Sequence, residues 1–208
     1  MLSPTAARFF PAVTRRFAVG LAGVGGVAAA LTSCGAGADY KGEAKLDRYD
    51  TSAGPYEPAT QEHPSKNVPV PIKPDNMGEN SVAGLHATIC YFAASLQYMM
   101  NTGDSQHLKD IRFDRKDLKS YTDVAELFDD KTWLSEVTVT IELTTSAPIR
   151  NTDGYQWPAK LTMKQGDFAL IRGKVSQVPQ NRKLVQSEGD ITGRYVEGSW
   201  NLSTPKKR

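Results

Sequence analysis

Cysteine and histidine are scarce in this chain of 208 residues, and their scarcity limits the chemistry that the protein can perform. The sequence contains two cysteines, Cys34 and Cys90, and three histidines, and none has the spacing of a structural or catalytic zinc site. A glycine-rich phosphate loop, a nucleophile elbow and a paired serine and histidine signature are also missing. We therefore expect no metal, no other cofactor and no catalytic residue, which argues against an enzyme.

Acidic side chains are missing from the first 38 residues, where three arginines occur instead. An apolar run of 15 residues, FAVGLAGVGGVAAAL, follows over residues 17–31. This run is shorter than the roughly 20 residues that a transmembrane helix needs. A positive start followed by a short apolar run is typical of a secretory signal peptide, which we predict over residues 1–33. The adjacent Arg15 and Arg16 leave a twin-arginine export route open beside ordinary secretion.

The four residues LTSC, at positions 31–34, resemble the lipobox of bacterial lipoproteins. The resemblance implies that the Cys34 thiol receives a diacylglyceryl group with fatty acyl chains such as palmitate. It also implies that cleavage makes Cys34 the mature N-terminus. Two or three acyl chains anchor a protein stably, because each buried methylene contributes about 0.8 kcal/mol. We therefore expect lipid attachment at Cys34 and a location on the extracytoplasmic face of the cell membrane.

A surplus of positive charge is also missing once the predicted leader is removed. Three of the 25 basic residues lie in the leader, which leaves 22 against 23 acidic residues and a net charge of about −1. The sequence has no dense stripe of lysine and arginine interleaved with aromatic residues, so we expect no nucleic-acid partner. The terminal PKKR, residues 205–208, is interpreted as a solvated basic tail.

Apolar periodicity is absent between the lipobox and residue 76. Residues 34–75 are rich in polar side chains and contain six prolines, a composition that is typical of a disordered tether. A docking segment for a partner is the alternative interpretation of the proline-rich stretch. We expect the folded domain over residues 76–204.

Helical periodicity begins close to Ser81. Apolar residues recur every three or four positions from Val82 to Met100, with Ser81 or Asn80 as a candidate N-cap and Gly103 as a candidate C-terminal stop. This pattern predicts one long amphipathic helix, with a thin polar strip that includes Gln97. Two short helices are predicted after it, in TGDSQHLKDI and in YTDVAELFDD.

After the helices, apolar and polar residues alternate with period two, which predicts four or five strands joined by hairpin-length turns. Helices first and strands afterwards indicate an α+β domain. We expect a long N-terminal helix and two short helices packed on a curved, mostly antiparallel sheet of four to five strands. The alternating segments are WLSEVTVTIEL (133–143), YQWPAKLTMKQ (155–165), DFALIRGKVSQV (167–178), KLVQS (183–187) and GRYVEGSWNLS (193–203).

The segment AGLHATICYFAASLQYMMNTGDSQHLKDI follows PVPIKP and precedes a late GSW strand. These features resemble an actinobacterial lipoprotein family known as domain of unknown function 6318. The likeness covers roughly residues 68–203. It implies an NTF2-like cone, the fold of nuclear transport factor 2, in which a bent sheet wraps around a long helix. It implies no activity, because the family has none assigned.

Aromatic side chains supply the remaining candidate site residues. Tyr91, Tyr98, Trp157 and Trp200 are candidates for a pocket or for the core, since tyrosine and tryptophan on a half-buried sheet usually fill space. We hypothesise a membrane-anchored binding or scaffolding domain whose partner is an envelope protein, a peptide or a cell-wall fragment. The alternative hypothesis is a small cone-fold enzyme, an isomerase or a hydrolase, with a tyrosine or a carboxylate in its pocket.

Overall fold

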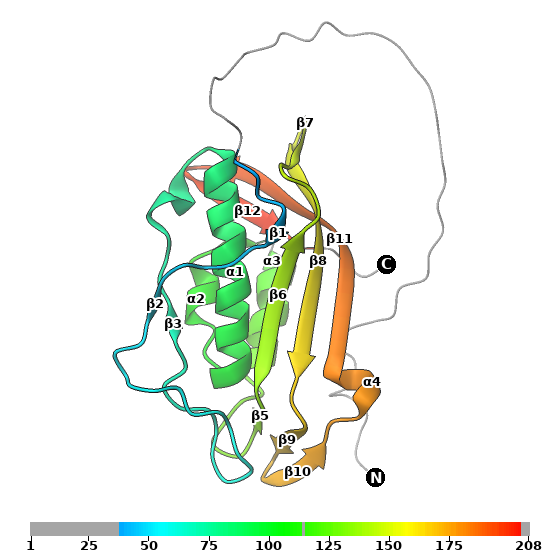
Figure 1. The fold of residues 1–208 in the computed structure, drawn as a ribbon. Coiled ribbons are helices and arrows are strands. Elements are labelled where there is room, and N and C mark those ends of the chain that lie inside the picture. The colour runs from blue at the N-terminus through cyan, green and yellow to red at the C-terminus, as the bar shows by residue number, and fades with distance from the viewer. Residues whose placement is uncertain (1–37, 114, 205–208) are drawn as a thin grey trace, which may run out of the picture.

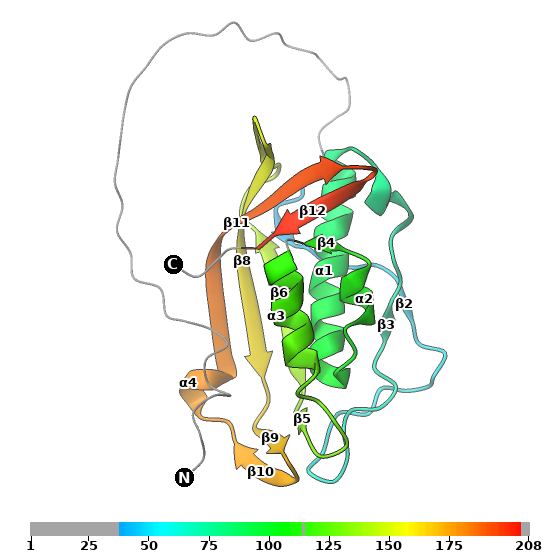
Figure 2. The same cartoon turned by 180° about the vertical axis from the view of Figure 1, so that it is seen from behind.

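The computed structural model describes residues 38–113 and 115–204, which are drawn in colour in Figure 1. The predicted signal peptide, the predicted lipidation site Cys34 and the predicted basic tail at 205–208 lie outside the described residues. Within the described part, strands account for more residues than helices, and a large sheet bends around one long helix (Figures 1 and 2).

The long helix α1 covers Val82–Thr102, as its periodicity predicted. Ser81 caps its start, because the Ser81 hydroxyl accepts a hydrogen bond from the Gly84 N–H at 3.0 Å. Gly103 ends the helix in the left-handed conformation, with φ at 78°. A Cβ atom at residue 103 would lie 2.5 Å from the Cβ of Phe128. Both the backbone conformation and the neighbouring ring therefore require glycine at this position.

The main sheet has seven strands in the order β1-β6-β8-β11-β12-β4, and β7 pairs with β8 outside this path. All neighbours are antiparallel except β12 and β4, which are parallel. The two longest strands, β8 and β11, have 12 and 13 residues and lie at the centre of the sheet. The strands are β1 Gly42–Glu43, β4 Arg112–Phe113, β6 Val137–Leu143, β7 Ile149–Asn151, β8 Gly154–Gln165, β11 Leu184–Val196 and β12 Ser199–Ser203.

Two smaller sheets and several short helices surround the main sheet. A three-stranded sheet, β10-β9-β5, lies at one end of the molecule, and a two-stranded ribbon of β2 and β3 lies beside α1 (Figure 1). The remaining elements are β2 Tyr49–Asp50, β3 Val70–Pro71, β5 Trp133–Leu134, β9 Phe168–Ile171, β10 Lys174–Gln177, the 3-10 helix η2 Asp75–Gly78, α2 Gln106–Lys109, α3 Arg115–Ala125 and α4 Gln180–Lys183.

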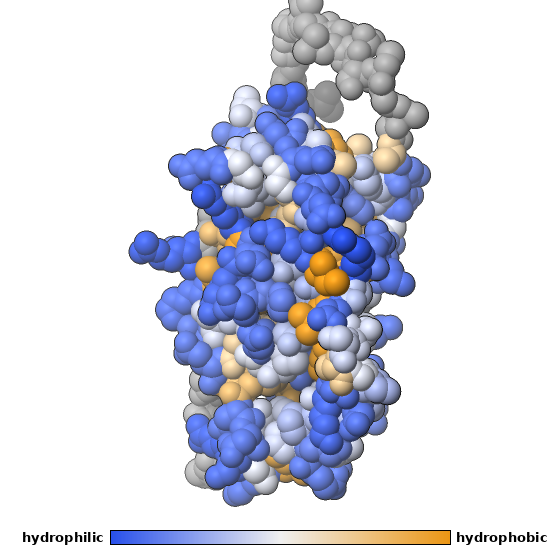
Figure 3. All heavy atoms as spheres, turned by 90° about the vertical axis from the view of Figure 1, so that its left-hand side faces the viewer, coloured by the Kyte–Doolittle hydropathy of each residue, from blue (hydrophilic) through white to orange (hydrophobic). Residues whose placement is uncertain are grey.

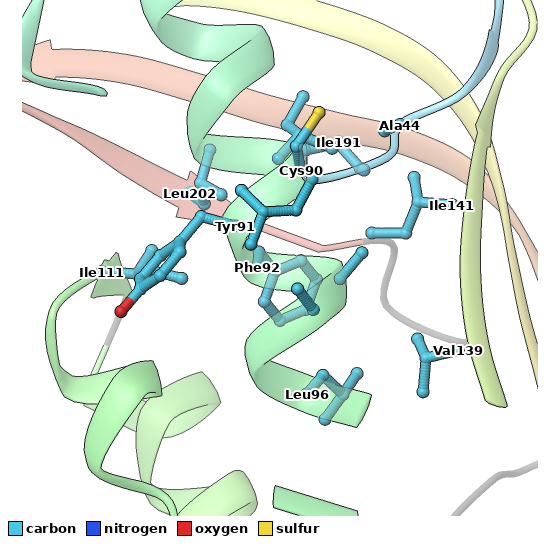
Figure 4. Packing of buried hydrophobic residues seen from close by; sticks show 14 of the residues in the cluster. Ala44, Cys90, Tyr91, Phe92, Leu96, Ile111, Val139, Ile141, Ile191 and Leu202 are labelled. Carbon is cyan, nitrogen blue, oxygen red and sulfur yellow. The ribbon is translucent and has the colours of Figure 1, made fainter. Parts of the chain in front are cut away.

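The core lies between α1 and the inner face of the main sheet. Phe92, Leu96 and Ile141 are all buried. Figure 4 shows Leu96 on the side of α1 that faces Val139 of β6, while the Phe92 ring packs against Phe113 of β4. On β11, a Cβ atom at Gly193 would lie 2.5 Å from the Cδ1 atom of Leu85. Glycine at this position therefore allows the strand to approach the helix closely, and the predicted apolar stripe of α1 is buried against the sheet.

The predicted fold class was wrong. The main sheet is mixed and has seven strands rather than four or five, two further sheets are present, and three short strands precede the long helix. Two-residue strands such as Gly42–Glu43 were missed because so short a segment has no alternation of side chains to mark it. The third predicted helix was also misplaced, since α3 begins at Arg115, six residues before the YTDVAELFDD segment.

Part of the segment interpreted as a disordered tether packs on the folded domain. Residues 38–50, which we call the strap, pair with β6 through β1. The strap buries Ala44, which is 3% exposed, and Leu46, which is 5% exposed. The Ala44 N–H donates a hydrogen bond to the carbonyl oxygen of Ile141 at 2.7 Å. Composition could not indicate this order, because two buried side chains and a few backbone hydrogen bonds hold the segment in place.

Candidate functional site

A groove of about 150 Å³ lies where the strap passes between α1 and the edge of β6. A space of roughly this size can hold one benzene-sized group. Alanines form part of its walls, and the charged, exposed side chains of Glu43 and Lys45 lie at its rim. We call it the β6 groove. Its lining consists of residues 43–46 and Tyr49 from the strap, Cys90, Ala93, Ala94 and Gln97 from α1, and residues 138–140 from β6.

Cys90 and His86 are one helical turn apart on α1, beside the β6 groove. The Cys90 Sγ atom lies 3.6 Å from Nε2 and 3.7 Å from Nδ1 of His86, so the sulfur is not directed at either nitrogen. Burial, with a smaller contribution from the nearby Asp47 carboxylate, raises the pKa of Cys90 to about 12. Burial also lowers the pKa of His86. Both side chains are therefore neutral near pH 7, whereas a nucleophilic cysteine needs a lowered thiol pKa.

Three aromatic rings fix the start of the strap over the same part of α1. The Tyr40 ring lies 4.4 Å from the His86 ring and 5.8 Å from the Trp157 ring, centroid to centroid. The Tyr40 N–H donates a hydrogen bond to the carbonyl oxygen of Ser146 at 3.1 Å. This packing attaches the strap to α1, to β8 and to the loop that follows β6.

Two amides of α1 form hydrogen bonds with the backbone of β6 beside the groove. Asn101 donates from Nδ2 to the Val137 carbonyl at 2.8 Å, and its Oδ1 accepts from the Val137 N–H at 2.9 Å. One turn earlier, the Gln97 Oε1 atom accepts from the Val139 N–H at 3.0 Å. Sequence reasoning placed Gln97 on a polar strip and gave it no such role. The available signal was the spacing of the two amides, since residues four apart share one helix face.

A second polar cluster lies on the opposite flank of α1. The Tyr91 hydroxyl donates a hydrogen bond to Asp110 Oδ2 at 3.1 Å and lies 3.1 Å from Nδ1 of His107. Burial, and next the Asp110 carboxylate, raise the pKa of Tyr91. The hydroxyl therefore stays protonated and acts as a hydrogen-bond donor. Figure 4 shows it pointing away from the side chains that face β6, so this cluster and the β6 groove are separate.

The other aromatic candidates from the sequence take structural positions. The Tyr98 ring packs edge-on against His107 at a centroid distance of 5.2 Å, which places it beside the Tyr91 cluster. Trp157 and Trp200 are buried in the core. Trp157 donates from Nε1 to the carbonyl oxygen of Thr145 at 3.1 Å, and Trp200 donates to that of Glu79 at 2.8 Å. The two tryptophans thus fill space while their N–H groups are satisfied.

A wider depression of about 500 Å³ lies between the end of α1, the turn before α2, and α3. Its lining is mainly small or charged, with Asp104, Lys109 and Glu126 among the residues. Figure 3 views the side of the molecule that carries β2 and β3. Hydrophilic residues cover most of this face, and apolar residues appear in small separate groups.

Neither a metal site nor a membrane span is evident in the described part of the chain. Within residues 38–113 and 115–204, no three His, Cys, Asp or Glu side chains cluster in a way that could hold a metal ion. Over the same residues, no helix has the length and apolar character needed to cross a membrane.

Comparison with protein families gives a match between residues 54–206 and the model of the Family of unknown function (DUF6318). The match covers about three quarters of the chain. The chain belongs to the DUF6318 family. The DUF6318 match includes α1 and β6, which form two walls of the groove, but it begins after the strap. Searches of curated proteins and of solved structures found no match.

Proposed function

We propose that the protein is a lipid-anchored binding module on the extracytoplasmic face of a bacterial cell membrane, and that the β6 groove receives its ligand. The anchor is supported by the signal-like leader and by LTSC at residues 31–34. The likeness of the sequence to an actinobacterial lipoprotein family is consistent with the same location. The acyl chains on Cys34 would hold the protein at the membrane.

The shape and lining of the groove are the observation that carries the binding role. Small side chains, Ala93 and Ala94, leave room for one apolar side chain of a ligand. Glu43 and Lys45 at the rim offer an acceptor and a donor for the polar groups around it. A small groove that combines an apolar wall with polar groups can accept one residue of a peptide or a cell-wall fragment.

The protonation states around the groove favour binding over catalysis. The Cys90 thiol, with a pKa of about 12, is not a nucleophile at neutral pH. Burial, and further the charges of Glu43 and Asp47, raise the pKa of Tyr49, so its hydroxyl also remains protonated. These groups can donate hydrogen bonds, but they are poorly suited to attack a substrate or to abstract a proton from it.

Membrane fractionation and mass spectrometry test the anchor. In the native host, Cys34→Ser should move the protein from the membrane fraction to the soluble fraction or leave the leader uncleaved. Intact-mass spectra of the wild-type protein should show acyl chains on an N-terminal Cys34. A mature protein with an unmodified Cys34 would contradict the proposal.

Nuclear magnetic resonance tests the groove, with the N-acetyl amides of leucine, phenylalanine and tyrosine as probes. We expect chemical-shift changes at residues 43–49, 90–97 and 138–140. Ala94→Phe should remove these changes by filling the groove, while Ala53→Phe, which adds the same ring on an exposed loop, should leave them intact. Shift changes that persist in Ala94→Phe, or that lie elsewhere, would contradict the proposed site.

A further inference from the structure

The strap is fixed to the domain very close to the proposed lipid anchor. Tyr40 is held by its N–H bond to the Ser146 carbonyl and by ring contacts with His86 and Trp157. Tyr40 is only six positions after Cys34 in the sequence. Six fully extended residues span at most about 20 Å. Whatever path the intervening residues take, an acylated Cys34 must lie within about 20 Å of Tyr40.

Tyr40 lies near one end of the elongated domain. It contacts the loop after β6, and this loop leads into β7, which projects from that end in Figure 1. The β9-β10 hairpin lies at the opposite end in both Figures 1 and 2. Strand β8 runs between the two ends, and its 12 residues span about 40 Å at roughly 3.3 Å per residue. The reach from Tyr40 to the anchor is therefore about half the length that separates the two ends.

The β7 strand, Ile149–Asn151, carries exposed side chains that suit a surface facing phospholipid headgroups. Ile149 is 59% exposed, the highest value among the large apolar side chains of the described residues. Arg150 follows it and is also exposed. An apolar side chain beside a cation can contact both the acyl boundary and the headgroup phosphates of a bilayer.

We propose that the domain stands on the membrane with the β7 end facing the bilayer, Ile149 at the headgroup region and the β9-β10 hairpin directed away from it. This orientation rests on the proposed acylation of Cys34. A free tether over residues 34–75 would allow any orientation, whereas the fixed strap keeps the β7 end closer to the anchor than the β9-β10 hairpin. The partner surface is the phospholipid headgroup layer to which the protein is anchored.

Energy transfer from the protein to the bilayer tests the orientation. Mature acylated protein from the native host is reconstituted in vesicles of phosphatidylethanolamine and phosphatidylglycerol that carry a headgroup-linked acceptor dye. A donor dye is attached to Ile149→Cys in one sample and to Val175→Cys, on β10, in the other; Val175 is 44% exposed. Cys90 should remain unlabelled, because burial raises its pKa to about 12. Transfer should be several-fold stronger from position 149, and equal or reversed transfer would overturn the proposal.

A matched insertion provides the control. About twenty glycine and serine residues placed between Gly37 and Ala38 add about 65 Å of extended reach, which should make the two positions nearly equal. A difference that survives the insertion would show that the anchor length does not set the orientation. Mass spectrometry of the same samples separates the two proposals. An unacylated Cys34 overturns both, whereas an acylated Cys34 with equal transfer overturns the orientation alone.

Discussion

The strap and helix α1 contribute to the same core, but their sequences could hardly differ more. Helix α1 has apolar residues at helical spacing along its whole length, and it satisfies its own backbone hydrogen bonds. The strap, residues 38–50, buries only Ala44 and Leu46 and uses the backbone of β6 for its hydrogen bonds. The difference teaches that apolar periodicity identifies segments that can form a core by themselves. A segment that pairs with a strand already in the sheet, as the strap does with β6, needs few apolar residues.

The two regions also meet at the candidate site. Strap residues 43–46 form one wall of the β6 groove, and Ala93 and Ala94 of α1 form another. The groove is therefore formed only when the strap is packed against α1 and β6. Substitutions that separately weaken the helix and the strap can therefore distinguish the contributions of the two regions to stability and to the site.

The largest effect should come from the centre of α1. Phe92 is fully buried, and its ring packs against the rings of Phe113 and Tyr121 at centroid distances of 5.3 and 5.8 Å. Phe92→Ala should lower the free energy of unfolding by about 3 to 5 kcal/mol, because it removes a large apolar side chain and leaves a cavity. Chemical denaturation monitored by circular dichroism measures this loss. A midpoint close to that of the wild-type protein would mean that α1 is peripheral to the core.

A somewhat smaller effect is expected in the strap. Leu46→Ala should lower the free energy of unfolding by about 2 to 4 kcal/mol, because Leu46 is buried although its segment looked disordered by composition. The control is Arg48→Ala, which removes an exposed ion pair with Asp75 and should leave stability nearly unchanged. If neither substitution changed the free energy of unfolding, residues 38–50 would be a free tether rather than a strap packed on the domain.

Loss of the contact between α1 and β6 should lower the free energy of unfolding by less than the two core substitutions do. Gln97→Met keeps the length of the side chain but removes the oxygen that accepts from the Val139 N–H. The loss should be about 1 to 3 kcal/mol, the typical cost of a part-buried N–H without a partner. Gln106→Met, on the exposed surface of α2, is the matched control and should be nearly neutral. If the two variants had the same denaturation midpoint, Gln97 would have no more than the solvent-facing role that its sequence position indicated.

At neutral pH the thiol of Cys90, between the helix and the strap, should show no titration effect, and its effect should appear only at alkaline pH. Its pKa is raised on folding to about 12, from an unfolded value near 8.5. The protonated thiol is thus favoured in the folded state, and its contribution to stability is complete below pH ~8.5 and lost as the pH rises toward 12. The denaturation midpoint of the wild-type protein should fall more between pH 9 and pH 11 than that of Cys90→Ser. Parallel pH profiles for the two proteins would contradict the assigned burial of the thiol.

Part of the fold could be predicted from the sequence because its signals are local. Periodicity and the caps at Ser81 and Gly103 gave α1, and alternation gave the longer strands such as β6 and β8. The two-residue strands and the seven-stranded sheet could not be predicted, because their pairing joins segments that carry no pattern of their own. The β6 groove was missed for the same reason, since one of its walls belongs to a segment that was interpreted as a tether. The contact of Tyr91 with Asp110 depends on how α2 folds back on α1, which no local signal specifies.

The amides of Gln97 and Asn101 have a consequence for how copies of the protein behave beside one another. An exposed edge strand offers unpaired N–H and carbonyl groups to the strands of neighbouring molecules, which is a common route to aggregation. Here side chains of the protein's own helix already occupy the Val137 and Val139 groups of β6. Copies held on one membrane by the proposed anchor would meet often, and the arrangement of these amides favours separate molecules over sheets that grow from one protein to the next.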